Sequence, residues 1–169
     1  MQLLKNGQPV GEDAGQPVED DALLPPEGAV VVSFNRWKKE RAQLHGSNTP
    51  VGVRMKNDEP VLELADDINR LDLIALTFPK FNDGRAFSQA RLLRERLGYK
   101  GELRATGAVF RDQLLFMQRC GFDAYEIGNA DAIGAWQKAL QEFTRFYQPT
   151  ADGRPALLFR HRAQAQAAE

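Results

Sequence analysis

The sequence predicts an α/β domain built around a mostly parallel β-sheet. Apolar runs of strand-like composition recur about every 20–30 residues, and each is followed by a stretch of helical periodicity. The 169 residues of the chain suit one domain. About five βα units are too few for a closed eight-stranded barrel. We therefore expect an open parallel sheet with helices on both faces, and a partial βα barrel is the alternative.

We expect one domain, residues 1–169, with small additions at both ends. Residues 1–27 form a hairpin and an irregular arm, because apolar residues flank the favoured turn dipeptide Asn6-Gly7. Residues 28–145 form the βα core. Residues 146–169 form a second hairpin, turning at Asp152-Gly153, and a frayed tail. The two hairpins could pair at a sheet edge.

The first half of the core contains three expected strands, at residues 29–34, 50–55 and 71–78. The first of these, AVVVSF, is an unbroken apolar run that suits a strand buried on both faces. Asn35 can cap the helix that follows it. Asn57 or Asp58 can open the helix between the second and third strands.

The second half continues the alternation with expected strands at residues 102–107 and 122–127. Residues 85–97 are predicted as a helix that stops at Gly98, and residues 108–120 as a helix that stops at Gly121. Asn129 or Asp131 can cap a last helix.

Composition argues against several classes of protein. The net charge of −1 gives no overall basic field for nucleic acid or membrane. No signal peptide or membrane-spanning run is visible, and Cys120 is the only cysteine. These features lead us to expect a protein of the cytoplasm. Cys120 stands at the end of a predicted helix, where a buried and inert thiol is expected.

No cofactor signature is visible. One cysteine cannot hold an iron–sulfur cluster, and His45 and His161 are the only histidines for a zinc site or a catalytic triad. We therefore expect no metal. Neither the Gly-rich Rossmann turn nor the P-loop motif is present, so nucleotide binding of either type has no sequence support.

The candidate site lies at the carboxyl ends of the strands, where open α/β sheets bind ligands. Arginine forks and inward-pointing N–H groups at helix starts, here Arg85 and Ala108, would favour an anionic ligand or an acidic partner. In the alternative, the arginines form ion pairs with Asp83, Asp112, Glu102 and Glu126. Asp83 and Asp112 are the candidates for proton transfer. The expected ligand-binding residues are Arg54, Lys80, Asp83, Gly84, Arg85, Arg104, Thr106 and Arg111.

Four segments resemble a known family: FPKFNDGR, ARLLRERLGYKGELRATG, RDQL and RCGFD. The family is a domain of unknown function in proteobacteria. Its genes usually lie beside that of assimilatory sulfite reductase, and members are often labelled as oxidoreductases of sulfite reduction. Family members often have an acidic residue at the position of Ala108 in this chain. If that acidic residue takes part in a reaction of the family, this chain lacks it.

The resemblance implies a role in sulfur assimilation. The first hypothesis is an accessory protein that recognises an anion or docks on sulfite reductase or its electron donor through the basic edge. The second is an enzyme acting on an anionic sulfur metabolite or nucleotide. The third, following the family label, is an oxidoreductase that uses a nucleotide cofactor.

Overall fold

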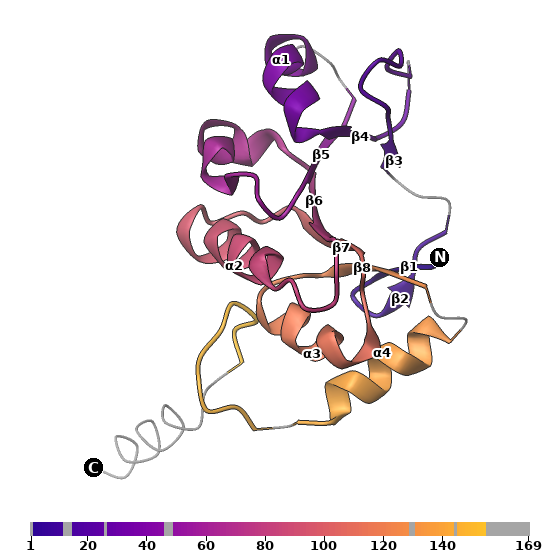
Figure 1. The fold of residues 1–169 in the computed structure, drawn as a ribbon, viewed down its shortest axis with the longest axis vertical. Helices are drawn as coiled ribbons and strands as arrows, with labels where there is room; N and C mark the ends of the chain where they lie inside the picture. Colours follow the sequence, from indigo (N-terminus) through magenta and orange to yellow (C-terminus); the bar gives the residue numbers. More distant parts are fainter. Residues whose placement is uncertain are drawn as a thin grey trace.

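The computed structural model of the chain describes residues 2–11, 15–25, 27–45, 49–128, 131–143 and 145–154. One eight-stranded sheet runs through it in the order β2-β1-β8-β7-β6-β5-β4-β3 (Figure 1). Strands β3 to β8 are parallel to one another, and β1 pairs antiparallel with both β2 and β8. The expected α/β class and the mostly parallel sheet are confirmed.

Five strands form the parallel core, and all five coincide with predicted strands. They are β4 (Val30–Ser33), β5 (Val51–Met55), β6 (Leu73–Phe78), β7 (Glu102–Gly107) and β8 (Ala124–Ile127). Three short strands from the N-terminus complete the edges of the sheet: β1 (Gln2–Lys5), β2 (Gln8–Pro9) and β3 (Gln16–Pro17).

Helices follow the strands in sequence. They are α1 (Phe34–His45), the 3-10 helix η1 (Val61–Arg70), α2 (Arg85–Arg91), the wide π-helical turn η2 (Leu92–Arg96), α3 (Arg111–Arg119) and α4 (Ala132–Gln141). No helix in the described part of the chain is long and apolar enough to cross a membrane.

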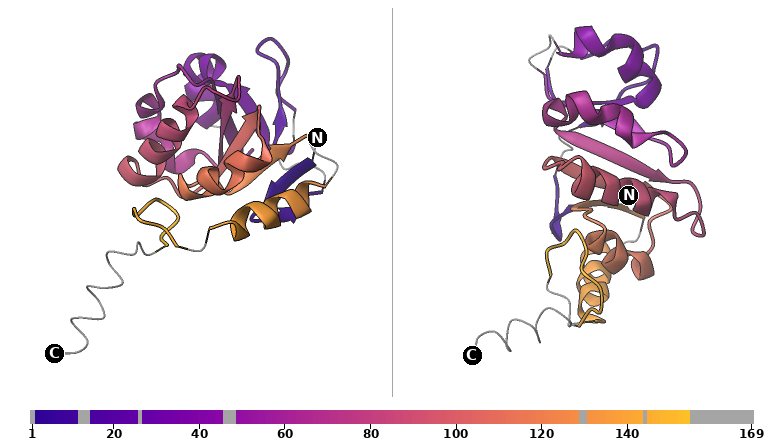
Figure 2. Two further views of the ribbon diagram at one scale, coloured as in Figure 1. Left: turned by 60° about the horizontal axis from the view of Figure 1, so that its bottom comes forward. Right: turned by 90° about the vertical axis from the view of Figure 1, so that its left-hand side faces the viewer.

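All of these helices gather on one face of the sheet, where we expected helices on both faces. The strands of the core lie in sequence order, so every right-handed crossover returns over the same side. The sheet curls around an inner, concave face, which the helices leave uncovered (Figure 2). The fold is therefore a curled, open half-barrel, as in the alternative prediction.

The length of the N-terminal connection is incompatible with a flat sheet. Pro9 ends the strand at one edge of the sheet and Gln16 begins the strand at the other edge. Seven spacings of about 4.8 Å would hold the edges of a flat eight-stranded sheet about 34 Å apart. The chain from Pro9 to Gln16 can reach at most about 25 Å. A flat sheet with these two strands at its opposite edges is therefore impossible.

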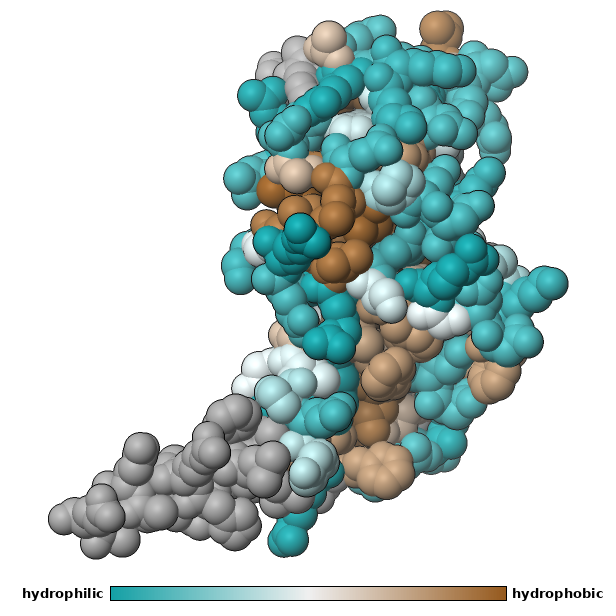
Figure 3. Space-filling model, turned by 60° about the vertical axis from the view of Figure 1, so that its left-hand side comes forward, coloured by the Kyte–Doolittle hydropathy of each residue, from teal (hydrophilic) through white to brown (hydrophobic). Residues whose placement is uncertain are grey.

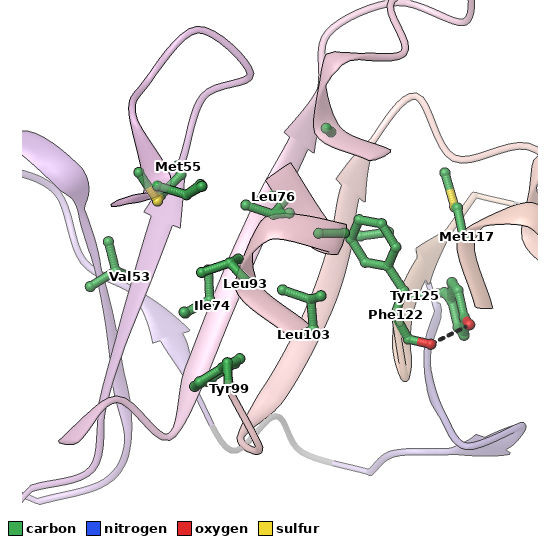
Figure 4. Packing of buried hydrophobic residues seen from close by; sticks show 14 of the residues in the cluster. Val53, Met55, Ile74, Leu76, Leu93, Tyr99, Leu103, Met117, Phe122 and Tyr125 are labelled. Carbon is green, nitrogen blue, oxygen red and sulfur yellow. Dashed lines mark hydrogen bonds between the residues drawn. The ribbon is translucent and has the colours of Figure 1, made fainter. Parts of the chain in front are cut away.

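The hydrophobic core lies between the helices and the convex face of the sheet. Val53, Ile74 and Leu103 point from neighbouring strands toward the helices, and each is fully buried (Figure 4). Tyr125 lies in the same layer and donates a hydrogen bond to the carbonyl of Phe122 over 2.8 Å. Because strand side chains alternate, the residues between these positions face the concave side.

Arg94 braces the amino ends of two strands. Its guanidinium donates to the carbonyls of Tyr99, Gly101 and Gly121 over 2.7–2.9 Å and to the Asp123 carboxylate over 2.9 Å. Asp123 in turn accepts from the Leu103 amide. The GYKG and RCGFD segments are therefore held together by one arginine, at the end of the sheet opposite the candidate site.

Several predicted boundaries differ from the structure. The helix expected after Asn57 or Asp58 begins only after Pro60 and is a 3-10 helix, in which Val61, Leu64 and Asp67 are buried at its three-residue period. The helix expected at residues 85–97 widens into the π-helical turn η2 from Leu92. Asp131 caps α4 by accepting from the Gly134 amide, and Asn129 lies outside the described residues.

The two predicted hairpins have different outcomes. The N-terminal hairpin is confirmed, with positive φ angles of 51° at Asn6 and 78° at Gly7, as a two-residue turn of this kind requires. It adds to the sheet beside β8. At the other end, Gly153 forms a turn with φ of 70°. Most of the C-terminal hairpin, residues 155–169, lies outside the described residues.

Candidate functional site

On the concave face of the sheet, the register of the strands aligns side chains in rows. One row across it runs through Ser33, Arg54, Ala75, Arg104 and Ala124, which are paired from strand to strand. Two residues further along, toward the carboxyl ends, Thr77 pairs with Thr106. Two arginines thus flank one alanine, with a pair of threonines beyond them.

Arg104 is buried and its charge is compensated. Only 3% of its side chain is exposed. Its guanidinium contacts the Glu102 carboxylate at 2.8 Å, and Glu126 lies 3.8 Å from it. Lys5, from β1, contacts the other oxygen of Glu102 at 2.7 Å. Arg104 therefore lies inside the half-barrel within an ion-pair network, as the alternative reading of the arginines expected.

Arg54 is the exposed arginine of the same row. It forms no salt bridge with any residue that the structure describes, and it lines a cavity of about 630 Å³. The other lining residues are Gln2, Leu3, Val10, Gly11, Pro17, Thr77, Thr106, Gly107 and Glu126. The cavity lies on the concave face toward the carboxyl ends of the strands, and its size is typical of a small-molecule site.

The cavity combines one positive end with hydroxyl groups and a carboxylate. The Thr106 hydroxyl lies 3.4 Å from that of Thr77 and 3.5 Å from the Leu76 carbonyl. Gly107 ends β7 with φ of 86°, and a Cβ there would lie 2.5 Å from the Phe78 carbonyl oxygen. Glycine is needed at this wall because the two backbones approach too closely for a side chain.

The loop after β6 lies outside this cavity. Asp83 forms two hydrogen bonds with the Arg85 guanidinium, at 3.0 and 2.8 Å, and accepts from the Arg85 amide at 3.4 Å. The Arg85 guanidinium holds the pKa of the Asp83 carboxyl well below its usual range. Asp83 therefore stays ionised near neutral pH and is poorly suited to donate a proton. Gly84 and Lys80 are exposed in the same loop.

The start of α3 also differs from the expectation. We placed the helix N-terminus at Ala108, but Ala108 donates to the Phe78 carbonyl and packs against the core, and α3 begins at Arg111. Arg111 pairs with Glu142 of the region after α4. Asp112 is exposed and lines a groove with Glu142. Neither Asp83 nor Asp112 lines the concave cavity.

Apolar side chains gather on the outer, helical surface among hydrophilic ones (Figure 3). Phe81 and Phe110 meet edge to face, with ring centroids 5.6 Å apart, and both are about half exposed. Gln113 links their two loops by donating to the Phe81 carbonyl. Phe116, Phe143 and Tyr147 are also exposed, around the groove between α3 and the segment after α4. We call these five residues the aromatic surface.

Cys120 lies in the hydrophobic core. Cys120 is buried, as expected, and burial raises the pKa of its thiol to about 11. No cluster of histidine, cysteine and carboxylate side chains suited to a metal ion occurs in the part of the chain that the structure describes. The cavity offers a guanidinium, two hydroxyls and a carboxylate, which suit binding and hydrogen bonding.

The structure thus brings Arg54 and Thr106 together at the cavity, with Arg104 buried in the same row. The remaining expected residues do not line the cavity: Lys80, Asp83, Gly84, Arg85 and Arg111. The sequence analysis missed Thr77 and the N-terminal residues Leu3, Val10 and Pro17, which form the apolar wall of the cavity. Thr77 could have been identified from the sequence, because it is the polar residue between buried Leu76 and Phe78 in an otherwise apolar strand. The N-terminal wall carried no such signal.

A known family model matches more than half of the chain. The family described as "Bacterial protein of unknown function (DUF934)" matches over residues 52–158. The chain belongs to this family. The DUF934 match begins within β5 and contains Arg54, Thr77, Thr106 and Glu126, whereas the N-terminal wall of the cavity lies before it. No curated protein and no solved structure matches the chain significantly.

Proposed function

We propose that this DUF934 protein binds a small anionic ligand in its concave cavity, as an accessory protein of assimilatory sulfite reduction. The observation that carries the ligand proposal is the contrast between Arg54 and Arg104. Arg104 is neutralised by carboxylates, whereas Arg54 is exposed to the cavity and forms no salt bridge within the described part of the chain. A guanidinium in a concave site with hydroxyls nearby favours carboxylate, sulfate or phosphate groups.

The electrostatic balance of the concave face supports the same proposal. Among the described side chains of β1 and β4 to β8 on this face, Lys5, Arg54 and Arg104 are cationic and Glu102 and Glu126 are anionic. One positive charge is left in excess, and it lies at Arg54. A bound anion would balance it in a site shielded from bulk water.

A thermal-shift titration tests the ligand proposal. Wild-type protein and the Arg54→Gln variant are heated with 0 to about 20 mM phosphate or sulfate at constant ionic strength. An anion at about 100 times its Kd raises the free energy of unfolding by about 2.7 kcal/mol. We expect stabilisation of the wild type beyond that of Arg54→Gln, because general salt effects act on both. Equal shifts in the two proteins would contradict anion binding at Arg54.

The pathway part of the proposal rests on the family resemblance in the four motif segments. A deletion strain tests it by growth on sulfate, sulfite and sulfide. If the deletion strain grows on sulfide but not on sulfate or sulfite, the result supports a role in sulfite reduction. Normal growth on all three sulfur sources would contradict that role.

Docking on a larger partner is the second candidate role, and the aromatic surface favours it. Exposed aromatic clusters are common at the centres of protein interfaces. Lys80 and Arg145 are exposed near these side chains, and neither forms a salt bridge with another described residue. A pull-down with the sulfite reductase hemoprotein at low and high salt, using wild type and a Phe110→Ser/Phe116→Ser variant, tests this role. Absence of a complex at low salt, where charged docking is strongest, would count against it.

A further inference from the structure

The cavity is bipolar, and its two ends are fixed by the sheet. Reading across neighbouring strands, Arg54 lies on β5, Thr77 on β6, Thr106 on β7 and Glu126 on β8. Leu3 of β1 pairs with Glu126 and lines the same cavity. The site therefore passes from a guanidinium, through two hydroxyls, to a carboxylate.

From this arrangement we infer that the ligand is a bipolar organic molecule with an anionic group at one end and an ammonium or similar donor group at the other. The inference rests on the proposed function, because it takes Arg54 as the seat of the anionic group. It adds a second recognition point at Glu126, and it distinguishes an organic ligand from an inorganic anion.

Glu126 is able to receive such a group. Its side chain is 23% exposed, so its carboxylate can be reached from the cavity. Arg104 lies 3.8 Å from one of its oxygens. An ionised carboxylate accepts about four hydrogen bonds, so Glu126 can accept from a ligand donor in addition to its partners within the protein. The neighbouring Arg104 weakens the attraction for a cation, so the expected effect is modest.

The dimensions of the cavity also favour an organic ligand. About 630 Å³ lies in the range of sites that enclose molecules of drug or metabolite size, far more than one oxyanion fills. Leu3, Val10 and Pro17 give it an apolar side, against which methylene groups or a ring can pack. The three strand steps from β5 to β8 span about 14 Å of backbone, and side chains that lean into a concave surface come closer than that.

A homologous series of simple probes tests this inference. Binding of 4-aminobutanoate, 6-aminohexanoate and 8-aminooctanoate to the wild type is measured by calorimetry beside butanoate, hexanoate and octanoate. We expect the amino acid of best length to bind roughly tenfold more tightly than the carboxylate of equal length, as for a hydrogen bond between charged groups. The preference should disappear in Glu126→Gln, while the affinity for the plain carboxylate stays the same.

The possible outcomes separate the two proposals. If plain carboxylates or phosphate bind and the amino group adds nothing at any length, the bipolar inference is wrong and the anion site stands. If no anion binds, the proposed function fails and the inference fails with it. Should Glu126→Gln fail to fold, the comparison of the two probe series on wild-type protein decides the question alone.

Discussion

Arg54 and Arg104 lie in one row of the sheet, on either side of Ala75, yet they have different surroundings. Arg104 is buried between Glu102 and Glu126, and Arg54 faces an open cavity. One arginine therefore serves the fold, and the other is available for a ligand. This division separates effects on stability from effects on binding.

Substitution of the two arginines should separate these roles. Arg104→Ala leaves Glu102 and Glu126 without their buried partner, so we expect a loss of about 3–5 kcal/mol in the free energy of unfolding. Arg54→Ala should change it by less than about 0.5 kcal/mol. Urea unfolding measures both, with exposed Arg70→Ala as the control. Equal destabilisation by the two substitutions would contradict the assignment.

Arg94 should be needed for stability and not for binding. Arg94→Ala removes hydrogen bonds to three carbonyls and to Asp123, and we expect a loss of about 3 kcal/mol. Lysine should not restore it, because an ammonium cannot reproduce the guanidinium fork. Arg96→Ala, at an exposed position of the same helical turn, is the matched control. Normal stability of Arg94→Lys would show that charge alone is sufficient.

Gly107 and Gly98 form a matched pair at positive φ. Gly98 has open space around its Cα, so Gly98→Ala should cost only the backbone term of about 1 kcal/mol. At Gly107 a Cβ would also meet the Phe78 carbonyl at 2.5 Å, so Gly107→Ala should cost about 3 kcal/mol. Chemical unfolding of both variants gives the difference. If the two substitutions lower the free energy of unfolding equally, the backbone around Gly107 can shift to accommodate the added methyl group.

The Asp83–Arg85 pair should make a pH-dependent contribution to stability. The pKa of Asp83 is lowered in the folded protein, so its contribution is present above the ordinary aspartate value of about 3.9 and decreases as the pH falls below it. Thermal melts of wild type and Asp83→Asn should differ most at pH 5–7 and converge toward pH 2. A difference that is constant with pH would exclude the ion pair as its source. Anion binding should be unaffected by Asp83→Asn.

The regular elements were predictable because the apolar periodicity is strong. Runs such as AVVVSF and LDLIALTF specify buried parallel strands, and Asn6-Gly7 specifies its hairpin. The distribution of helices was not predictable from periodicity, since it depends on strand order. In this sheet the core strands lie in sequence order, which places every crossover on the same face.

The site could be predicted only in part for a related reason. The carboxyl-edge rule selected Arg54 and Thr106 correctly as neighbours, but it treated every residue near a strand end as pointing to one place. Side-chain alternation along β7 places Arg104 on the concave face, whereas Asp83 and Arg85 lie in the loop after β6 and at the start of α2. The ion pairs of Arg104 further depend on Glu126, which the parallel pairing of β7 with β8 places beside it, and on Lys5, which the antiparallel pairing of β1 with β8 brings to Glu102.

An NMR titration tests the central claim most directly, because it locates the anion. Phosphate is added to ¹⁵N-labelled protein, and the amide and Arg54 Nε resonances are followed. Binding in the concave cavity predicts saturable shifts at Arg54, Thr77, Thr106 and Gly107, all of which are lost in Arg54→Gln. Shifts confined to residues 80–85 and 111–113 would place the anion at the outer carboxyl edge and contradict the claim, as would the absence of any saturable shift.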